Sequence, residues 1–401
     1  MQNFSLTKRL LGRCRHWATW RCAEPVVVFE SDDWGLERQA CASLLCDFGV
    51  PGEWADEETE TPEDLAALYA VLAGHHDTFG RPACMTANFV VANPDWDAIA
   101  ESHYTRYHDR PIDENHLLRE HWLAGYHTRV FLPQYHARHH FRTTAWLRDL
   151  QEDVPGARAL FAHRCPGGLA LLAGQGWRYH TEYLDWHAAT PDTTTASIPE
   201  LSAALDIFQR TFGFASRSTI APHYIFPDHA AHAWQLAGIH SIQGAGYRLL
   251  RTPGRDTPRV LSHVLGERSP EGQVYLTRPV KFDPRPQRPQ HGAQAAIARI
   301  KHCFANHIPA IIDTHRINYT GRWRGEALAS LREVLAALAP DNPLYLTSPE
   351  LGEAIANQGR FHDAFSHECR TLTPLETVWR VGWRRWLTQQ NRATIAQHTD
   401  T

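Results

Sequence analysis

Short apolar runs alternate with segments of helical periodicity along most of this chain, and this alternation constrains the fold more than any other feature. The apolar runs are predicted strands, at Val26–Phe29, Ala83–Val91, Thr128–Leu132, Thr219–Ile225, His240–Gln243, Gln273–Thr277, Ala310–Asp313 and Pro343–Thr347. The segments between them are predicted helices, at Pro62–Ala73, Thr143–Leu150, Ile198–Phe212, His229–Ala237, Gly292–Ala305 and Gly325–Leu338. Strands that alternate with helices usually pair in parallel, with each helix crossing over. Seven or eight such units predict an α/β fold, a (β/α) barrel, rather than two separate domains.

The composition is that of an ordinary globular protein. The 401 residues are 43% hydrophobic and 21% charged, with a formal net charge of −4. Because nucleic-acid-binding domains are usually strongly basic, this balance does not support nucleic acid as a partner. The 26 histidines are many for this length, which directs attention to metal binding and acid–base chemistry.

The cysteines and the hydropathy predict a cytoplasmic protein. The cysteines form no C-x-x-C pair and no dense framework, at positions 14, 22, 41, 46, 84, 165, 303 and 369. Such spacing favours a reducing compartment over a disulfide scaffold. Residues 1–23 are basic but contain no apolar run of signal-peptide length. No window approaches the roughly 18 apolar residues of a membrane span.

Three regions follow from these patterns: a basic N-terminal segment (1–23), the barrel (24–352) and a C-terminal helical extension (353–401). Residues 187–200 and 281–292 are predicted surface loops. In the extension, Thr373 is a predicted N-cap, with Pro374 at the first helical position and Glu376 completing a capping box. One face of this helix is apolar and carries Leu375, Val378, Trp379, Gly382 and Trp386. It either docks on the barrel or forms a basic-aromatic surface for a membrane or protein partner, with Arg380, Arg384 and Arg385.

Two adjacent carboxylates, Asp32 and Asp33, follow the first predicted strand directly. In a parallel barrel the catalytic groups lie at the carboxyl ends of the strands. Taken alone, an Asp-Asp pair after a strand is more often a loop or a helix cap. The buried strand that leads into it makes the pair costly unless the site needs both charges.

Three histidines follow two other strands. His136 and His140 are spaced i, i+4, which on a helix places both imidazoles on one face. Two imidazoles with one carboxylate make an open three-ligand site that suits zinc, with nickel, cobalt or ferrous iron as alternatives. His315 follows the strand at Ala310–Asp313, and Arg316, Asn318 and Tyr319 crowd the same strand end with donors suited to an oxygen-rich ligand.

Together these groups predict a metal-dependent hydrolase. One Asp and two His hold the ion, the second Asp takes a proton from bound water, and His315 protonates the leaving group. Two alternatives remain open on the sequence. One is a glycoside hydrolase on the same barrel, which needs two carboxylates and no metal. The other is a glycan-binding homologue that has lost turnover.

The layout resembles the polysaccharide deacetylase superfamily, carbohydrate esterase family four. The deacetylase-type motifs correspond to "ESDDWG" (30–35), to the histidine spacing of "HARHH" (136–140) and to "IIDTHR" (311–316). A closer resemblance is to an uncharacterised branch of polysaccharide (de)acetylases from surface-glycan gene clusters. It is carried by "SDDWG" (31–35), "MTANFVVANPD" (85–95), "HARHH", "SRSTIAPHY" (216–224) and "THRINYTG" (314–321). It spans roughly residues 24–352. Ala137 and His139 depart from the branch's H-G-R-E-H, which puts the partner of the metal ligands in doubt.

This resemblance implies removal of an acetyl group from a sugar of a glycan or glycan precursor. It implies Asp32 as base, His315 as acid, and Asp33, His136 and His140 as metal ligands. A backbone N–H near Pro222–Tyr224 would hold the oxyanion, and our candidate is that of Tyr224. The literal R-x-P-x-G match at Arg164 is then chance.

Further residues are predicted to bind the substrate. Asn88 and Arg278 either contact the ligand or support the site, and Trp34 either stacks on a sugar ring or packs under a loop. The predicted substrate-binding set is Trp34, Asn88, Arg138, Arg278, Arg316, Asn318 and Tyr319.

Overall fold

The computed structural model describes residues 19–49, 52, 54–167, 181–183, 197–251, 257–357 and 371–377. Its main sheet contains β1 (Val26–Trp34), β2 (Met85–Val90), β5 (Phe131–Ala137), β6 (Ser218–Thr219), β7 (Ser241–Gly244), β10 (Val274–Thr277), β11 (Val280–Lys281), β12 (Ala310–His315) and β13 (Leu344–Tyr345). Two antiparallel pairs lie outside it, β3 (Ala92–Pro94) with β4 (Asp109–Pro111) and β8 (Tyr247–Leu250) with β9 (Arg259–Ser262). The helices are α2 (Ala42–Asp47), α3 (Pro62–Ala73), α4 (Trp96–Glu101), α5 (His116–His127), α6 (Thr143–Gln151), α7 (Ala157–Ala162), α9 (Ile198–Phe212), α10 (Asp228–Leu236), α11 (Ala293–Ala305), α12 (Arg324–Leu338), α13 (Ser348–Ala356) and α14 (Pro374–Thr377).

The main sheet is parallel and curls on itself. Its strand order is β10-β7-β6-β5-β2-β1-β12-β11, and β13 pairs with the start of β1. Only Arg278 and Pro279 separate β10 from β11, yet β10 bonds to β7 and β11 bonds to β12. One short segment therefore bridges the two ends of the strand path, and the sheet is a distorted (β/α) barrel, as predicted.

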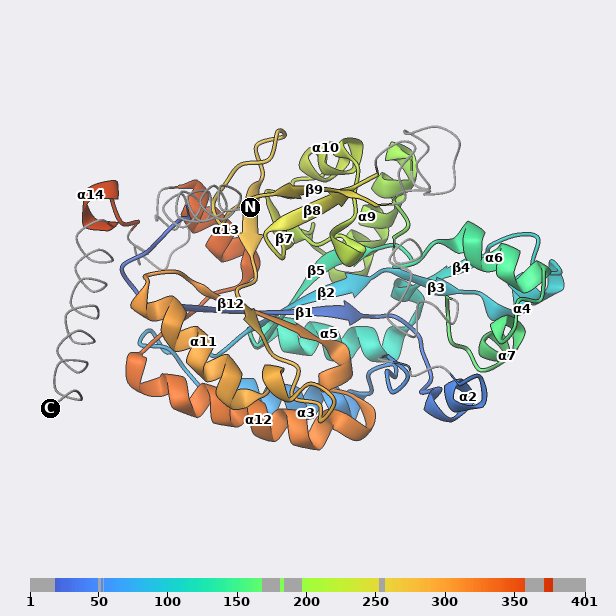
Figure 1. Ribbon diagram of the computed structural model, residues 1–401, viewed down its shortest axis with the longest axis horizontal. Coiled ribbons are helices and arrows are strands. Elements are labelled where there is room, and N and C mark those ends of the chain that lie inside the picture. Colours follow the sequence, from blue (N-terminus) through green and yellow to red (C-terminus); the bar gives the residue numbers. More distant parts are fainter. Residues whose placement is uncertain are drawn as a thin grey trace, which may run out of the picture.

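Alternate residues of β1 serve two different cores. Val27 and Phe29 belong to the large cluster between the sheet and its outer helices, which includes Leu65 of α3 and Leu331 of α12. Val26 and Val28 instead pack inside the barrel, in the cluster that contains Leu351 and Ile355 of α13. Because β1 is covered on both faces, all nine of its residues are buried. Figure 1 shows α3, α5, α11 and α12 along one side of the sheet, with α9 and α10 on another.

The structure changes several predicted boundaries. Strand β1 continues to Trp34, so the Asp pair lies inside the strand rather than after it. His136 belongs to strand β5, and α6 begins only at Thr143, as predicted for that helix, so the i, i+4 spacing of His136 and His140 is not helical here. The predicted strand at Thr219–Ile225 reduces to the two-residue β6 and a 3-10 helix at Pro222–Tyr224.

The other predicted segments can be compared with the described elements. Helix α13 runs through the predicted boundary at residue 352, and the predicted loop at 281–292 contains the end of β11 and a 3-10 helix. The capping box of Thr373 and Glu376 is present. Most of the 187–200 loop and the C-terminal helix beyond Thr377 lie outside the described residues. Among the described residues, no helix is long and apolar enough to cross a bilayer.

The packing of α13 against β7 predicts a stability effect. A Cβ at Gly352 would lie 1.8 Å from Ser241 Oγ and 2.9 Å from Ser241 Cβ. Because this contact is buried in packed structure, we expect Gly352→Ala to lower the free energy of unfolding by about 1–3 kcal/mol. Gly325→Ala, in exposed space at the start of α12, is the matched control and should be neutral or stabilising by up to about 1 kcal/mol. Urea unfolding of both variants measures the difference, and equal midpoints would contradict the packing.

Candidate active site

A cavity of about 300 Å³ lies where β1, β5, β6 and β12 end. It brings together residues from seven separate parts of the chain. They are Asp32, Asp33, Leu36, Arg38, Trp54, Glu57, His136, His140, Ile220, Ala221, His223, Tyr224, Tyr247, Lys281, Arg288, Asp313 and His315. The carboxyl ends of parallel strands are where barrel enzymes place their chemistry.

Both carboxylates of the Asp pair line this cavity, although neighbouring strand residues normally point to opposite faces. Asp33 has φ of +75°, and the pairing of β1 with β2 shifts register between Ser31 and Trp34. Asp is one of the few residues that adopts a left-handed backbone at modest cost. This irregularity turns the second carboxylate into the site beside the first.

Asp33, His136 and His140 converge in a geometry that fits a divalent cation. Asp33 Oδ1 lies 3.5 Å from His136 Nε2 and 3.1 Å from His140 Nε2. Ligand atoms that share a tetrahedral zinc lie about 3.0–3.5 Å apart, given metal–ligand bonds near 2.1 Å. Asp33 Oδ1 is buried and has no hydrogen-bond partner among the described residues. A buried acceptor of this kind is costly unless a cation or a water satisfies it.

The protonation states also suit a metal. His136 Nδ1 lies 2.8 Å from the Ile220 carbonyl, so that nitrogen carries the proton and Nε2 presents its lone pair toward Asp33. Burial raises the pKa of the Asp33 carboxyl, but the adjacent His140 and His136 imidazoles hold that pKa well below its usual range. The three residues therefore offer two imidazole nitrogens and one ionised carboxylate.

Glu182 fixes the turn that carries His140. Its carboxylate accepts three consecutive backbone N–H groups, from Arg138 at 2.7 Å, His139 at 2.5 Å and His140 at 3.2 Å. His140 has φ of +67° in this turn. A reversed backbone after a strand, rather than a helix, thus brings the second imidazole back to the first.

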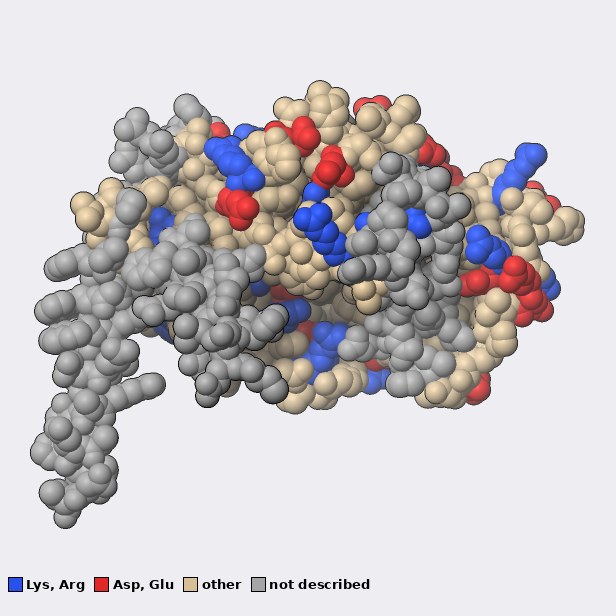
Figure 2. All heavy atoms as spheres, turned by 45° about the horizontal axis from the view of Figure 1, so that its top comes forward, with Lys and Arg blue, Asp and Glu red and all other residues tan. Residues whose placement is uncertain are grey.

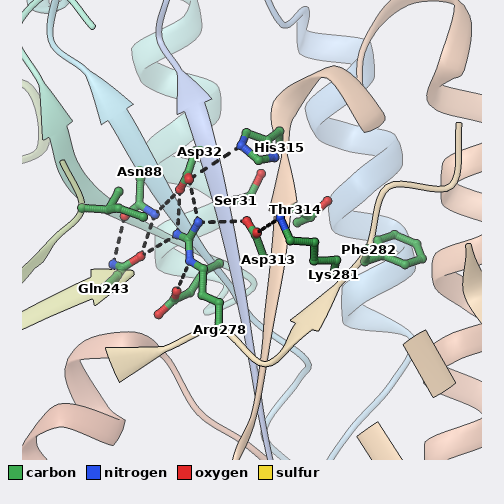
Figure 3. Close-up of polar contacts among 12 residues, drawn as sticks. Ser31, Asp32, Asn88, Gln243, Arg278, Lys281, Phe282, Asp313, Thr314 and His315 are labelled. Carbon is green, nitrogen blue, oxygen red and sulfur yellow. Dashed lines mark hydrogen bonds and ion pairs between the residues drawn. The ribbon is translucent and has the colours of Figure 1, made fainter. Parts of the chain in front are cut away.

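Asp32 is held by two buried partners. Its Oδ1 accepts from Asn88 Nδ2 at 2.7 Å and from Arg278 at 2.8 Å, and its Oδ2 accepts from Arg278 at 2.6 Å (Figure 3). Burial raises the pKa of Asp32, but the charge and hydrogen bonds of Arg278 outweigh it and lower the pKa to about 2. Asn88 and Arg278 are buried, and Gln243 bonds to both. Asn88 and Arg278 were predicted either to contact the ligand or to support the site, and their buried positions agree with the second role.

Arg278 contacts two further carboxylates. Its Nε lies 2.5 Å from Glu30, and one of its terminal nitrogens lies 3.0 Å from Asp313 (Figure 3). Glu30 is fully buried, and burial raises the pKa of its carboxyl although Arg278 and the Ser348 hydroxyl oppose that change. One guanidinium therefore organises three carboxylates from β1 and β12.

His315 forms the other wall of the cavity. Its Nε2 lies 3.9 Å from Asp32 Oδ2, which is too long for a hydrogen bond. The Trp54 ring meets the imidazole edge-on, with ring centroids 5.0 Å apart. With a side chain 28% exposed, His315 is the most accessible of the histidine and aspartate residues assigned to catalysis or metal binding.

Several residues predicted to bind substrate lie in the interior instead. Trp34 is buried, donates to Ser31 Oγ and stacks on Tyr319. Asn318 and Tyr319 are also buried, and both bond to Thr314. Arg316 has no exposed surface. None of these four is among the described residues that line the cavity.

Arg316 instead connects the segment after β12 to the loop after β1. It donates to the Leu36 carbonyl at 2.5 Å, to Glu60 at 2.9 Å and to Glu57 at 3.2 Å. Arg38 also pairs with Glu57. This buried network holds the loop that carries Trp54 against His315.

Two other predicted residues are positioned differently. Arg138 lies outside the cavity and donates to Asp109 at 2.8 Å. Tyr224 lines the cavity, but its backbone N–H already donates to the Ala221 carbonyl at 2.9 Å. That N–H would have to leave this bond to hold an oxyanion. Arg164, the literal motif match, is exposed and is not among the described residues that line the cavity.

Sequence reasoning missed Trp54, Glu57, Tyr247, Lys281 and Arg288 as cavity residues, and Glu182 as the anchor of the turn. Trp54 and Glu57 lie in the loop after β1, and Lys281 ends β11. Loops that follow barrel strands usually carry the site, which is the signal that could have found them. Glu182 has no such signal, since its three partners are backbone groups distant in sequence.

Comparison with known proteins finds only distant likeness. No family model and no curated protein match the chain. An inferred polysaccharide deacetylase from Mycobacterium smegmatis is 12% identical, with a TM-score of 0.39 over 87% of this chain and 99% of that one. An inferred glycoside hydrolase or deacetylase from Parabacteroides distasonis is 10% identical, with a TM-score of 0.42 over 84% of this chain and 73% of that one. A 4-alpha-glucanotransferase from Thermococcus litoralis is 8% identical, with a TM-score of 0.36 over 82% and 40%. At this similarity the side chains of the site have to carry the functional argument.

The triad predicts a matched pair of metal-binding variants. His140→Ala removes one ligand and should weaken binding of Zn²⁺ or Co²⁺ at least about tenfold. His139→Ala is the control, because the His139 imidazole faces Asp109 at 2.5 Å rather than Asp33. Calorimetric titration of metal-free protein measures both affinities. Equal losses in the two variants would show that the triad is not the cation site.

The pKa of Asp32 predicts a pH dependence of stability. A carboxyl whose pKa falls from 3.8 to about 2 on folding stabilises the native state above pH 3.8 and loses that contribution as the pH falls through about 2. We expect metal-free wild type to exceed Asp32→Asn by about 2 kcal/mol in free energy of unfolding at neutral pH. The difference should stay constant down to about pH 4 and shrink below it. Urea unfolding at several pH values measures this, and a difference that grows on acidification would contradict the assignment.

Proposed function

We propose that this protein is a divalent-metal-dependent hydrolase that removes an acetyl group from a sugar of a glycan or glycan precursor. The observation that carries the proposal is the Asp33–His136–His140 triad in one cavity with Asp32 and His315. The acetylated-sugar substrate follows from the resemblance of the motifs at 31–35, 136–140 and 314–321 to polysaccharide deacetylases.

Asp33, His136 and His140 would hold the cation. Two imidazoles and a carboxylate suit zinc, with nickel, cobalt and ferrous iron as alternatives. When bound, the cation supplies Lewis-acid chemistry: it lowers the pKa of water and stabilises negative charge on an acyl oxygen. The remaining chemistry belongs to the side chains around it.

Asp32 takes the proton from the attacking water. Its low pKa keeps the carboxylate ionised throughout the physiological range. Arg278 and Asn88 fix its orientation, but Oδ2 accepts only one of the described hydrogen bonds. Since a carboxylate oxygen has two lone-pair sites, Oδ2 retains one for the proton. That oxygen also faces His315.

His315 gives a proton to the departing sugar nitrogen or oxygen. It lines the same cavity as the triad without belonging to it, and this position suits an acid that acts on the leaving group rather than on water. The loop carrying Trp54, held by Arg316 and the two glutamates at 57 and 60, keeps the imidazole at that wall.

The glycoside hydrolase alternative has less support. That reaction needs one carboxylic acid that retains its proton near neutral pH. The pKa values of Asp32 and Asp33 are both lowered, so neither carboxyl suits this role. Glu30, whose pKa is raised, is fully buried and is not among the described residues that line the cavity.

The proposal predicts that Asp32→Asn abolishes turnover and retains the cation. Loss of the base should lower kcat at least about 100-fold, while the three metal ligands remain. Acetate release from a panel of N- and O-acetylated saccharides, with metal content of the same samples, measures both properties. Asp95→Asn is the control, because Asp95 caps α4 away from the cavity and Asn caps equally well. Full activity in Asp32→Asn would show that another group is the base.

A further inference from the structure

We infer that the substrate carries an anionic group, a phosphate or a carboxylate, on the leaving-group side of its sugar, and that Lys281 and Arg288 bind it. This inference rests on the proposed function and specifies its substrate class. It comes from the position and the charge balance of the two cations at the cavity mouth.

Lys281 and Arg288 lie on the His315 side of the cavity. Lys281 ends β11 and pairs in register with Asp313, two residues before His315 on the neighbouring strand. Both cations line the same cavity as His315. Because His315 protonates the departing sugar, the saccharide extends past this wall and reaches the two cations.

Buried arginines hold the carboxylates beside Lys281 and Arg288 at shorter distances than these two cations do. Arg278 holds Asp313 at 3.0 Å, and Lys281 Nζ lies farther from that carboxylate, at 3.5 Å (Figure 3). Arg285 binds Asp283 through two contacts of 2.7 and 2.8 Å, and Arg288 Nε lies 3.4 Å from the same carboxylate. Each rim cation therefore shares a carboxylate that a closer arginine already holds.

Lys281 also remains accessible. Its side chain is 57% exposed, whereas that of Arg278 is 1% exposed. An ammonium at a cavity mouth loses little hydration until a ligand arrives, and a charge-assisted hydrogen bond to phosphate or carboxylate then compensates that loss. The long flexible stem lets the group turn from Asp313 to a ligand.

The proposed selection is local to the two cations. Figure 2 shows basic and acidic side chains of the described residues interspersed on the displayed face rather than gathered in one patch. Among these described residues, no broad basic patch that would attract any polyanion is present on this face. Trp54 adds an aromatic wall next to His315, with the Arg285 guanidinium 5.5 Å from its ring centroid. A sugar ring beside Trp54 would place its substituents near the rim cations.

The test compares matched substrates on the metal-loaded full chain. The panel contains a neutral N-acetylhexosamine, its 1-phosphate and the corresponding N-acetylhexosaminuronic acid, with O-acetylated equivalents. We expect kcat/KM for the phosphate or the uronic acid to exceed that for the neutral sugar at least about tenfold. The ratio should fall as ionic strength rises, and the arm with the larger ratio identifies phosphate or carboxylate as the source of the charge.

Lys281→Met should bring the ratio of anionic to neutral kcat/KM toward one. Lys301→Met is the control. Lys301 lies on α11, outside the cavity, and pairs with Asp341, so this variant should keep the wild-type ratio. Equal hydrolysis of neutral and anionic substrates by wild type would overturn the inference and leave the proposed function intact. If no substrate releases acetate, calorimetric binding of the same sugars decides: tighter, Lys281-dependent binding of the anionic sugars supports the anion site while the hydrolytic proposal fails, and equal binding overturns both.

Discussion

The ion pairs of the Arg278 guanidinium are the interactions on which both the barrel and the site depend. It lies between β10 and β11, where the chain changes its hydrogen-bonding partner from β7 to β12 and so joins the two ends of the strand path. At the same point it contacts Glu30, Asp32 and Asp313, all buried. Removing one partner from a buried ionic cluster leaves charges uncompensated, and such losses typically cost several kcal/mol. The contact that orients the proposed base therefore also holds the sheet together.

Strained backbone contributes to the shape of the cavity. Of the eleven non-glycine residues with positive φ in the described part of the chain, four line it: Asp33, His140, His223 and Tyr224. Such conformations cost free energy and persist only where the surroundings enforce them. At Asp33 the strain turns a second carboxylate into the site, and at His140 three N–H bonds to Glu182 enforce the turn. A regular strand would have pointed Asp32 and Asp33 to opposite faces and kept His136 and His140 about 13 Å apart.

The sequence predicted the barrel because apolar periodicity reports burial, and burial is what the strands and helices of this fold share. It also predicted which side chains meet at one end, since parallel strands all finish at the same edge. The local geometry was less accessible. A spacing of four residues is compatible with a helix or with a strand followed by a reversed turn, and His136 and His140 adopt the second.

Partners distant in sequence were the hardest part to predict. Nothing around Glu182 marks it as the acceptor for residues 138–140, because the bonds go to backbone N–H groups that every sequence provides. The opposite difficulty concerns three residues that were predicted to bind substrate: Arg316, Asn318 and Tyr319. Polar residues after a strand suggest a binding surface, yet these three turn inward. Asn318 and Tyr319 bond to Thr314, and Arg316 bonds to Glu57 and Glu60.

The buried and the exposed charged residues of the site have different roles. Buried arginines hold buried carboxylates in fixed geometry, which keeps Asp32 ionised and oriented before any substrate arrives. The cations that retain contact with water, Lys281 foremost, are held less closely and can change partner. In a site of this kind, the buried ion pairs would determine the reaction and the exposed cations would determine the substrate. Under the proposed function, substitutions of these cations should therefore change which acetylated sugar is used before they change the chemistry performed on it.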